Sequence, residues 1–330
     1  MKKSIIAMAV AGALAVPAIA SADATLYGHV MMAVDSVKDQ KLEIGSQANS
    51  ESRIGLRGTA ATGIDGVSGV YQFEFGVNTN QTSYDPVARD ADGVARTDAT
   101  TGAIGNPNTL RTRLANAGLT GGFGTVLLGS QWTPHYSWAT SRTDIMMSSA
   151  ANVLNPTQGG IFRVSDSLAY VSPSFGGFQV AAAIVANGVD GSKTTDVHHV
   201  AARYEANGFG AALSWVDFTN TEARAIAASA GYDFGAGMVA LGYAENRNAD
   251  GTDTVKPWDL AVSYKVADAT TLKYVYADHR GGAKGHGLEL QHDLSNMVNT
   301  FVGYGYANSN LRDPGTTTND TFSAGMRVRF

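Results

Sequence analysis

Apolar and polar residues alternate along stretch after stretch of this sequence, and this pattern limits the folds that the chain can adopt. The segment Val67–Val77 is the clearest case. One of its faces carries Val67, Tyr71, Phe73, Phe75 and Val77, and the other carries Ser68, Gln72 and Glu74. A sustained period of two predicts a β-strand with one apolar and one polar side. The final segment, TFSAGMRVRF, repeats the pattern and places Arg327 and Arg329 on its polar side.

The same reasoning extends over nearly the whole chain. The expected strands are Ala24–Val34, Ser52–Gly58, Val67–Val77, Leu110–Leu119, Gly124–Trp132, Ser167–Val171, Phe178–Ala186, Val197–Glu205, Gly210–Phe218, Ala223–Phe234, Met238–Asn246, Pro257–Val266, Thr271–His279, Gly287–Leu294, Met297–Ala307 and Thr321–Phe330. Short turns alternate with longer polar connections, which is the layout of outer-membrane barrels. One segment, ARAIAASA at 223–230, would favour a helix by propensity, and only its context predicts a strand.

The fold class that follows is all-β, a 16-stranded antiparallel transmembrane β-barrel. Too little of the chain is expected to be helical to cover the apolar faces of so many strands in a soluble protein. A closed sheet has no exposed edge, and a water-filled interior tolerates charges that a packed core would not. The arginines of the last strand therefore indicate water on the inner side.

The first residues, 1–22, are expected to form a secretory signal peptide. Lys2 and Lys3 precede an apolar segment, and Ala20-Ser-Ala22 resembles a cleavage site. Its removal would change the net charge from −5 to −7, a balance that argues against a nucleic-acid partner. The sequence has no cysteine, which excludes disulfides and thiolate catalysis. The remainder, 23–330, is expected to form one barrel domain.

The segment from Thr133 to Asp166 shows neither turn chemistry nor sustained periodicity. Such a long connection inside a compact domain is usually functional. We expect it to fold inward and to narrow the opening that the strands enclose.

Several ordered motifs together resemble one family, the trimeric general-diffusion porins of Gram-negative outer membranes. The motifs are ATLYGHV, SRIGLRG, VYQFEF, RTRLANAGLTGGFGTVLLGSQ and the terminal strand ending in Phe330. The resemblance implies a homotrimer in outer-membrane lipid, and a water-filled channel for passive diffusion of ions and small hydrophilic solutes. It also implies that the third extracellular loop narrows the channel to an eyelet, here at about 133–166.

The resemblance also implies the residues of this eyelet. Basic residues of the barrel wall are His29, Arg53, Arg111, Arg113 and Arg163; Glu74 lies beside them, and Asp144 is an acid of the loop. The Pro-Glu-Phe-Gly-Gly segment of the family's loop is missing, and Ser148 stands where an acid is expected. We therefore expect a weak preference for anions. Asn116 is out of pattern, because the alternation places it on the lipid side of its strand.

The sequence carries fewer motifs for other functions, such as an enzyme or a metal-binding protein. No Gly-x-Ser-x-Gly or His-Glu-x-x-His motif indicates an enzyme. No cofactor or metal is expected, since the run Asp90-Ala-Asp-Gly93 lacks the later ligands of a calcium loop. The alternative is a substrate-specific channel for a sugar or similar solute, lined by Trp132, Tyr136 and Trp138.

Overall fold

The computed structural model describes residues 23–40, 42–46, 48–79, 110–154, 161–188, 193–221, 223–250, 252, 256–278, 280, 284–308 and 319–330. The expected signal peptide at 1–22 and the run at 90–93 lie outside the described residues, so both remain predictions.

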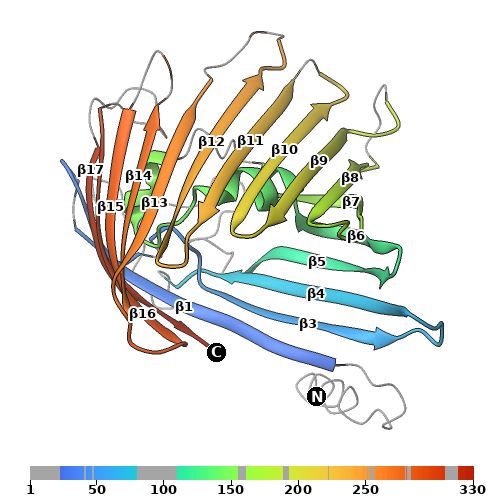
Figure 1. Cartoon of the computed structure of the whole chain (residues 1–330), viewed down its shortest axis with the longest axis horizontal. Helices are drawn as coiled ribbons and strands as arrows, with labels where there is room; N and C mark the ends of the chain where they lie inside the picture. Colours follow the sequence, from blue (N-terminus) through green and yellow to red (C-terminus); the bar gives the residue numbers. More distant parts are fainter. Residues whose placement is uncertain are drawn as a thin grey trace, which may run out of the picture.

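Seventeen β-segments form a single antiparallel sheet that closes on itself (Figure 1). The segments are β1 (Asp23–Val37), β2 (Glu43–Ser46), β3 (Arg53–Ala61), β4 (Val67–Val77), β5 (Leu110–Gly121), β6 (Gly124–Trp132), β7 (Arg163–Val171), β8 (Phe178–Val185), β9 (Val197–Ala206), β10 (Phe209–Phe218), β11 (Arg224–Asp233), β12 (Gly237–Arg247), β13 (Trp258–Ala267), β14 (Thr270–Asp278), β15 (Lys284–Asp293), β16 (Val298–Ala307) and β17 (Asn319–Arg329). From β3 onward each strand pairs with the next, and β1 pairs with β17 on one side and with β3 on the other.

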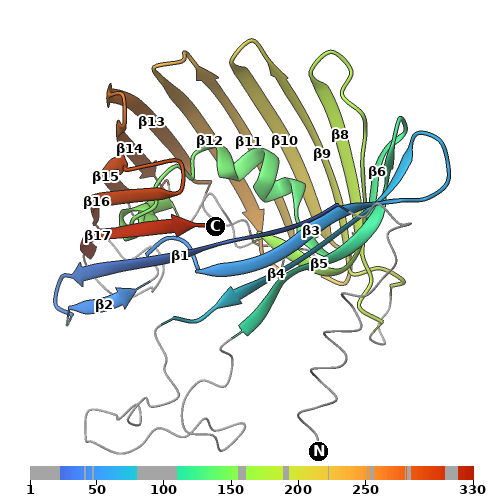
Figure 2. The ribbon, with the colours of Figure 1, turned by 90° about the horizontal axis from the view of Figure 1, so that it is seen from below.

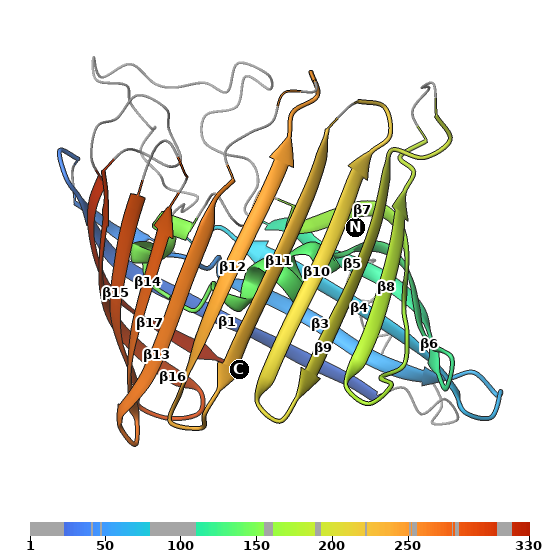
Figure 3. The same cartoon turned by 45° about the horizontal axis from the view of Figure 1, so that its top comes forward.

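The short segment β2 does not add a strand position to the barrel. β1 pairs with β3 from Asp23 to His29 and with β2 from Ala33 to Asp35, so β2 and β3 share the same side of β1. The barrel therefore has 16 positions, which confirms the predicted fold class. In Figure 3 the tilted strands surround a common interior.

The alternation of the sequence becomes an inner and an outer face. Large apolar side chains such as Val200, Leu213, Leu241, Leu288 and Val302 are exposed on the outer surface. Their neighbours along each strand point inward, because successive side chains of a strand point to opposite faces. An outer apolar band of this kind is the surface that lipid contacts. Within the described part of the chain, no helix is both long and apolar enough to cross a membrane.

The alanine-rich segment at 223–230 is extended, as its context predicts. β11 pairs residue by residue with β10 and β12. Ala225 and Ala227 of this strand are buried on the inner side. Helix propensity is outweighed here, because both neighbours supply a complete ladder of hydrogen bonds and the inner face needs small residues.

The predicted end of the long connection was wrong by four residues. β7 begins at Arg163, not at Ser167, so the connection spans Thr133–Phe162. A bulge causes the difference. The pairing with β6 shifts between Gly129 and Gln131, and Asp166 has a positive φ of 52°. The extra residue of a bulge interrupts the alternation that the prediction relied on.

Candidate functional site

The connection after β6 lies inside the barrel (Figure 2). Its described part contains a π-helical turn, η1 (His135–Ala139), followed by two 3₁₀ turns, η2 (Thr140–Arg142) and η3 (Ser149–Leu154). The segment η1 contacts β9, β10 and β11, whereas η3 contacts β14 to β17. Between them η2 contacts β11 and β12, so these turns follow the inner wall from β9 to β17, and we call the connection the inner loop.

Small side chains of the wall make room for the first half of the inner loop. Trp138 packs against the buried alanines Ala181, Ala201, Ala212 and Ala227 of four successive strands. Beside it, His135 Nδ1 lies 2.6 Å from Ser214 Oγ. Bulkier residues at these alanine positions would displace η1.

The second half of the inner loop rests on β13 to β16. Met146 packs against Ala261, Val275 and Ala277. A Cβ atom added to Gly303 would overlap the side chain of Ser148. Glycine at this position therefore allows the loop to approach the strand closely.

Carboxylates of the wall hold the same part of the loop by hydrogen bonds. Glu289 Oε2 accepts from the backbone N–H of Met147 at 2.8 Å and of Ser148 at 2.7 Å. Lys273 Nζ donates to the other oxygen of Glu289 at 2.8 Å. Farther along the wall, on β1, Asp35 Oδ2 accepts from Ser149 Oγ at 2.6 Å. An acid in place of Ser148 would meet Glu289, which explains why a serine fits here.

Three arginines from two strands, β3 and β5, gather around two glutamates on the inner wall, and we call this group the arginine–glutamate cluster. Arg113 donates to Glu74 from Nε at 2.6 Å and to Glu51 from Nη1 at 2.7 Å. Arg111 forms a bidentate pair with Glu51 at 2.8 and 3.0 Å. Arg53 Nη1 lies 3.6 Å from Glu74 Oε1. The cluster comprises Arg53, Arg111, Arg113, Glu51 and Glu74.

A bulge in β5 lets both halves of that strand present polar groups to the interior. The pairing with β4 moves from Glu74 opposite Leu114 to Phe75 opposite Thr112, so Arg113 is the extra residue. The inward side therefore changes from odd to even residue numbers. Asn116 lines an interior cavity as a result, and its predicted place on the lipid side was wrong.

The other predicted site residues lie around this cluster. Arg163 lies over the Trp132 ring at 4.7 Å, and Arg113 lies over the same ring at 5.6 Å. His29 Nε2 is 3.0 Å from the carbonyl oxygen of Glu51. Asp144 accepts hydrogen bonds from Tyr136 Oη at 2.8 Å and from Asn49 Nδ2 at 3.0 Å.

Two of these participants were not predicted as parts of the site from the sequence. Glu51 precedes the SRIGLRG strand and belongs to no alternating pattern, so only its position just before Arg53 could have indicated it. Trp132 was considered only as a sugar contact. Its ring instead lies within reach of the guanidinium groups of both Arg113 and Arg163, which is a favourable arrangement for cation–π attraction.

The ionisable groups at the loop and its wall are shifted by their surroundings. Burial would raise the pKa of the Glu51 carboxyl, but hydrogen bonds from Arg111 and Arg113 outweigh it and hold this pKa below its ordinary value. Burial and the carboxylate of Asp144 raise the pKa of the Tyr136 phenol. Glu51 is thus an anion and Tyr136 a neutral donor. Four arginines then face three carboxylates, which leaves an excess of positive charge.

The aromatic residues expected for a sugar-specific channel do not form one track. Trp138 is buried between η1 and the wall, with 8% of its surface exposed. Trp132 and Tyr136 are stacked at 5.1 Å, and Phe162 meets Tyr136 edge-on at 4.8 Å. In the described residues, no three His, Cys, Asp or Glu side chains are placed to hold a metal ion.

Known proteins resemble this chain in both sequence and fold. The major outer membrane protein P.IB of Neisseria gonorrhoeae is 29% identical over 227 residues, which cover 63% of this chain and 55% of that protein. The P.IB protein of Neisseria sicca is 28% identical, with 63% and 56% covered. The chain thus spans about half the length of the curated relatives it matches.

Solved structures share the fold at lower identity. The anion-selective porin from Comamonas acidovorans aligns with a TM-score of 0.71 at 19% identity, covering 94% of this chain and all of that one. OmpF of Salmonella typhi, in complex with daunomycin, aligns with a TM-score of 0.69 at 18% identity and covers 93% and 97%. The barrel and the relatives place this chain in the outer membrane. The model of the Gram-negative porin family matches residues 7–311, and the chain therefore belongs to the Gram-negative porins.

Proposed function

We propose that this protein is a channel for the passive diffusion of ions and small hydrophilic solutes, with a weak preference for anions. The observation that carries the proposal is the arginine–glutamate cluster on the wall of a closed barrel whose interior contains the inner loop. In this proposal the loop and the cluster together form the narrowest part of the channel. The predicted residues His29, Arg53, Glu74, Arg111, Arg113, Asp144 and Arg163 are its lining or its support.

The preference for anions follows from the charges. The Glu51 and Glu74 carboxylates are held by arginines, and the remaining positive charge favours anions. Two unit charges ~6 Å apart in water interact by roughly 0.7 kcal/mol, so one arginine changes ion permeability only about threefold. Charges at the narrowest point dominate, because the screening length at physiological salt is about 8 Å. A structural neighbour carries the words "anion-selective" in its name, which agrees with this direction.

The assembly is proposed as a homotrimer embedded in outer-membrane lipid. A structural neighbour, OmpT of Vibrio cholerae, is described in a trimer form. We also propose that residues 1–22 are removed as a signal peptide during export, and that 23–330 is the barrel domain.

Planar-bilayer recordings of the purified protein test the proposal. In a salt gradient, the reversal potential is expected to indicate a modest preference for chloride over potassium. Arg111→Gln is the most direct variant, because the Arg111 side chain is 63% exposed. It should reduce the chloride preference up to about threefold, and Arg113→Ala should act in the same direction.

Arg224→Gln is the matched control, because Arg224 lies on β11, far from the cluster in the barrel. It is expected to leave the reversal potential unchanged. A strong cation preference of the wild-type protein, or no change with either cluster variant, would refute the proposal. Closures in three equal steps would support a trimer.

A further inference from the structure

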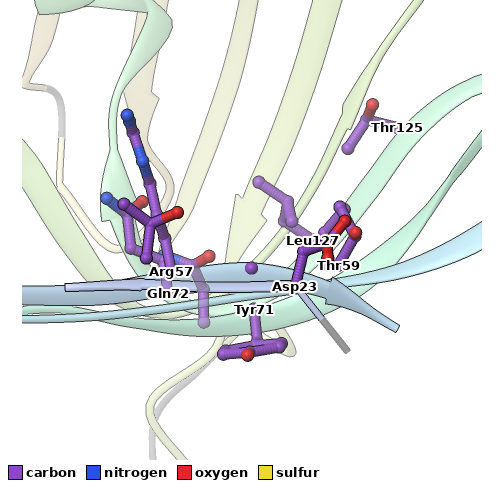
Figure 4. A pocket seen from close by; sticks show the side chains of 11 residues that line it. Asp23, Arg57, Thr59, Tyr71, Gln72, Thr125 and Leu127 are labelled. Carbon is purple, nitrogen blue, oxygen red and sulfur yellow. The ribbon is translucent and has the colours of Figure 1, made fainter. Parts of the chain in front are cut away.

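The cavity that Asn116 lines is polar and lies on the inner wall formed by β1 and β3 to β6 (Figure 4). It has a volume of about 510 Å³, within the range of about 300–1,000 Å³ that is usual for small-molecule sites. Side chains of five segments, β1 and β3 to β6, contribute to it. The polar ones are Asp23, Thr25, Arg57, Thr59, Gln72, Asn116 and Thr125.

Arg57 differs from the arginines of the cluster in its contacts. Among the described residues it forms no ion pair, whereas each arginine of the cluster contacts a glutamate. Its guanidinium lies 5.1 Å from the centre of the Tyr27 ring. The Tyr27 hydroxyl in turn donates to Glu74 Oε2 at 3.0 Å and accepts from Gln72 Nε2 at 2.7 Å. Arg57 is thus positioned by a fixed ring and is available to an anion.

The carboxylate nearest in register to Arg57 does not neutralise it. Thr25 pairs with Arg57 across the strands, so Asp23 and Tyr27 are its two diagonal neighbours on the same face. Diagonal neighbours lie about 7–8 Å apart, within reach of an arginine side chain. Arg57 nevertheless lies over Tyr27, and Figure 4 shows Arg57 and Asp23 on opposite sides of the cavity. Space for a ligand remains between them.

Two amide side chains, Gln72 and Asn116, line the cavity. Gln72 uses its Nε2 group for Tyr27, and Asn116 donates from Nδ2 to the carbonyl oxygen of Ser130 at 2.9 Å. The side-chain oxygens of both amides therefore remain without a donor in the described structure. The cavity combines one cationic donor with at least two neutral acceptors.

We propose that this cavity binds a small carboxylate that also carries a hydroxyl or ammonium donor. The carboxylate pairs with Arg57, whose planar fork suits bidentate contact. The ligand's donor hydrogen-bonds to the oxygens of Gln72 and Asn116. Asp23 favours an ammonium over a hydroxyl. If residues 1–22 are removed, the new terminal ammonium of Asp23 offsets the charge of its side chain. The requirement that the ligand carry a carboxylate then depends on Arg57. The inference rests on the proposed channel only for access of the ligand.

Saturation-transfer NMR on the mature protein in detergent tests the proposal with four probes of one chain length. These are 3-hydroxypropionate, β-alanine, propionate and propylammonium. At least one of the two donor-bearing carboxylates should bind about fivefold more tightly than propionate, the usual effect of one hydrogen bond. Propylammonium should bind more weakly than that ligand.

Variants identify the cavity as the site. Arg57→Gln should weaken binding of the preferred carboxylate about tenfold or more, because it removes a charged hydrogen-bond partner. Arg57→Lys keeps the charge but loses the planar fork, so it should weaken binding less than Arg57→Gln does. If Arg57→Gln does not fold, Arg57→Lys is used in its place as the test of the site. Arg224→Gln is the control and should bind as the wild type does. Asp23→Asn should weaken β-alanine selectively if the natural ligand is an amino acid.

The proposal is overturned if none of the carboxylates binds, if propionate binds as tightly as both donor-bearing probes, or if folded Arg57→Gln retains wild-type affinity. Because the measurement detects binding rather than conduction, a protein that fails to conduct in bilayers can still bind the probes. Failure of the channel function and failure of this site are therefore distinguished.

Discussion

Acid is expected to release the first half of the inner loop from the wall, through protonation of His135. This residue is fully buried, and its Nε2 atom has no hydrogen-bond partner among the described residues. His199 of β9 meets it edge-on, with 6.3 Å between the ring centres. Other charged groups at this contact are engaged elsewhere. Arg203 lies over Trp138, and Arg142 forms an ion pair with Glu205.

The magnitude follows from the pKa of the imidazole. Burial lowers the pKa of His135 from 6.5 to about 4. A histidine with a lowered pKa stabilises the docked loop fully above pH 6.5, and this contribution is lost as the pH falls from 6.5 to 4. Below pH 4, His135 is protonated in both the docked and the released loop, and the docked loop loses no further stability. The difference between the two pKa values corresponds to about 3 kcal/mol, or about 300-fold in the docking equilibrium.

Hydrogen–deuterium exchange of the protein in detergent measures this effect at the loop. After correction for intrinsic exchange rates, amides of 133–142 should exchange faster at pH 4.5 than at pH 7.5, while those of β13 and β14 should not. His135→Asn is the matched variant, because it retains a polar group near Ser214 but does not titrate in this range. Its exchange should show little dependence on pH. If wild type and His135→Asn respond equally to acid, His135 is not the cause and the reasoning fails.

Three further substitutions test the contacts of the loop and the cluster. Gly303→Val should displace the loop from β16, because a side chain there overlaps Ser148, and single-channel conductance should change; Gly122→Val, where a Cβ meets open space, should not change it. Glu289→Gln should lower stability to heat by about 3–5 kcal/mol, since it leaves buried Lys273 without its anion; unchanged thermal unfolding would contradict this. Glu51→Gln should increase the chloride preference in reversal-potential measurements, and a shift toward cations would contradict the charge argument.

The barrel could be predicted well from the sequence, because the alternation of apolar and polar residues is set within each strand and does not change when the sheet closes. Sixteen strand positions, including the helix-prone β11, follow from it and from the spacing of turns. The connection from β9 to β10 shows the same locality. Asn207 and Gly208 both have positive φ, as a two-residue hairpin turn requires, and the Asn-Gly pair indicates this in advance.

The positions of the β-bulges could not be predicted from the alternation of apolar and polar residues. The extra residue at Arg113 reverses the inward side of β5, and a similar shift moves the start of β7. Both occur next to the inner loop. A pattern of period two does not indicate where one strand has an extra residue relative to the strand it pairs with. The predictions for Asn116 and for the end of the inner loop were therefore wrong.

The partners within the site were less predictable than its residue types. Glu51 lies just before β3 and reaches Arg111 and Arg113 of β5 across β4, where Gly76 lies opposite both Arg53 and Arg111. The alanines beneath Trp138 are a signal that could have been used, since small inward residues on four successive strands indicate that something fills the space beside them.

The positions of the acids also explain why the loop's fixation and the channel's charge preference are compatible. Glu289 is fully buried, and its oxygens bind Lys273 and two backbone N–H groups. Asp35 is buried too and accepts from Ser149. These acids lie between the loop and the wall and are shielded from the open lumen, because both side chains are buried. The exposed guanidinium of Arg111 has no such cover. The loop can therefore be anchored by negative charge while a passing ion is exposed mainly to positive charge.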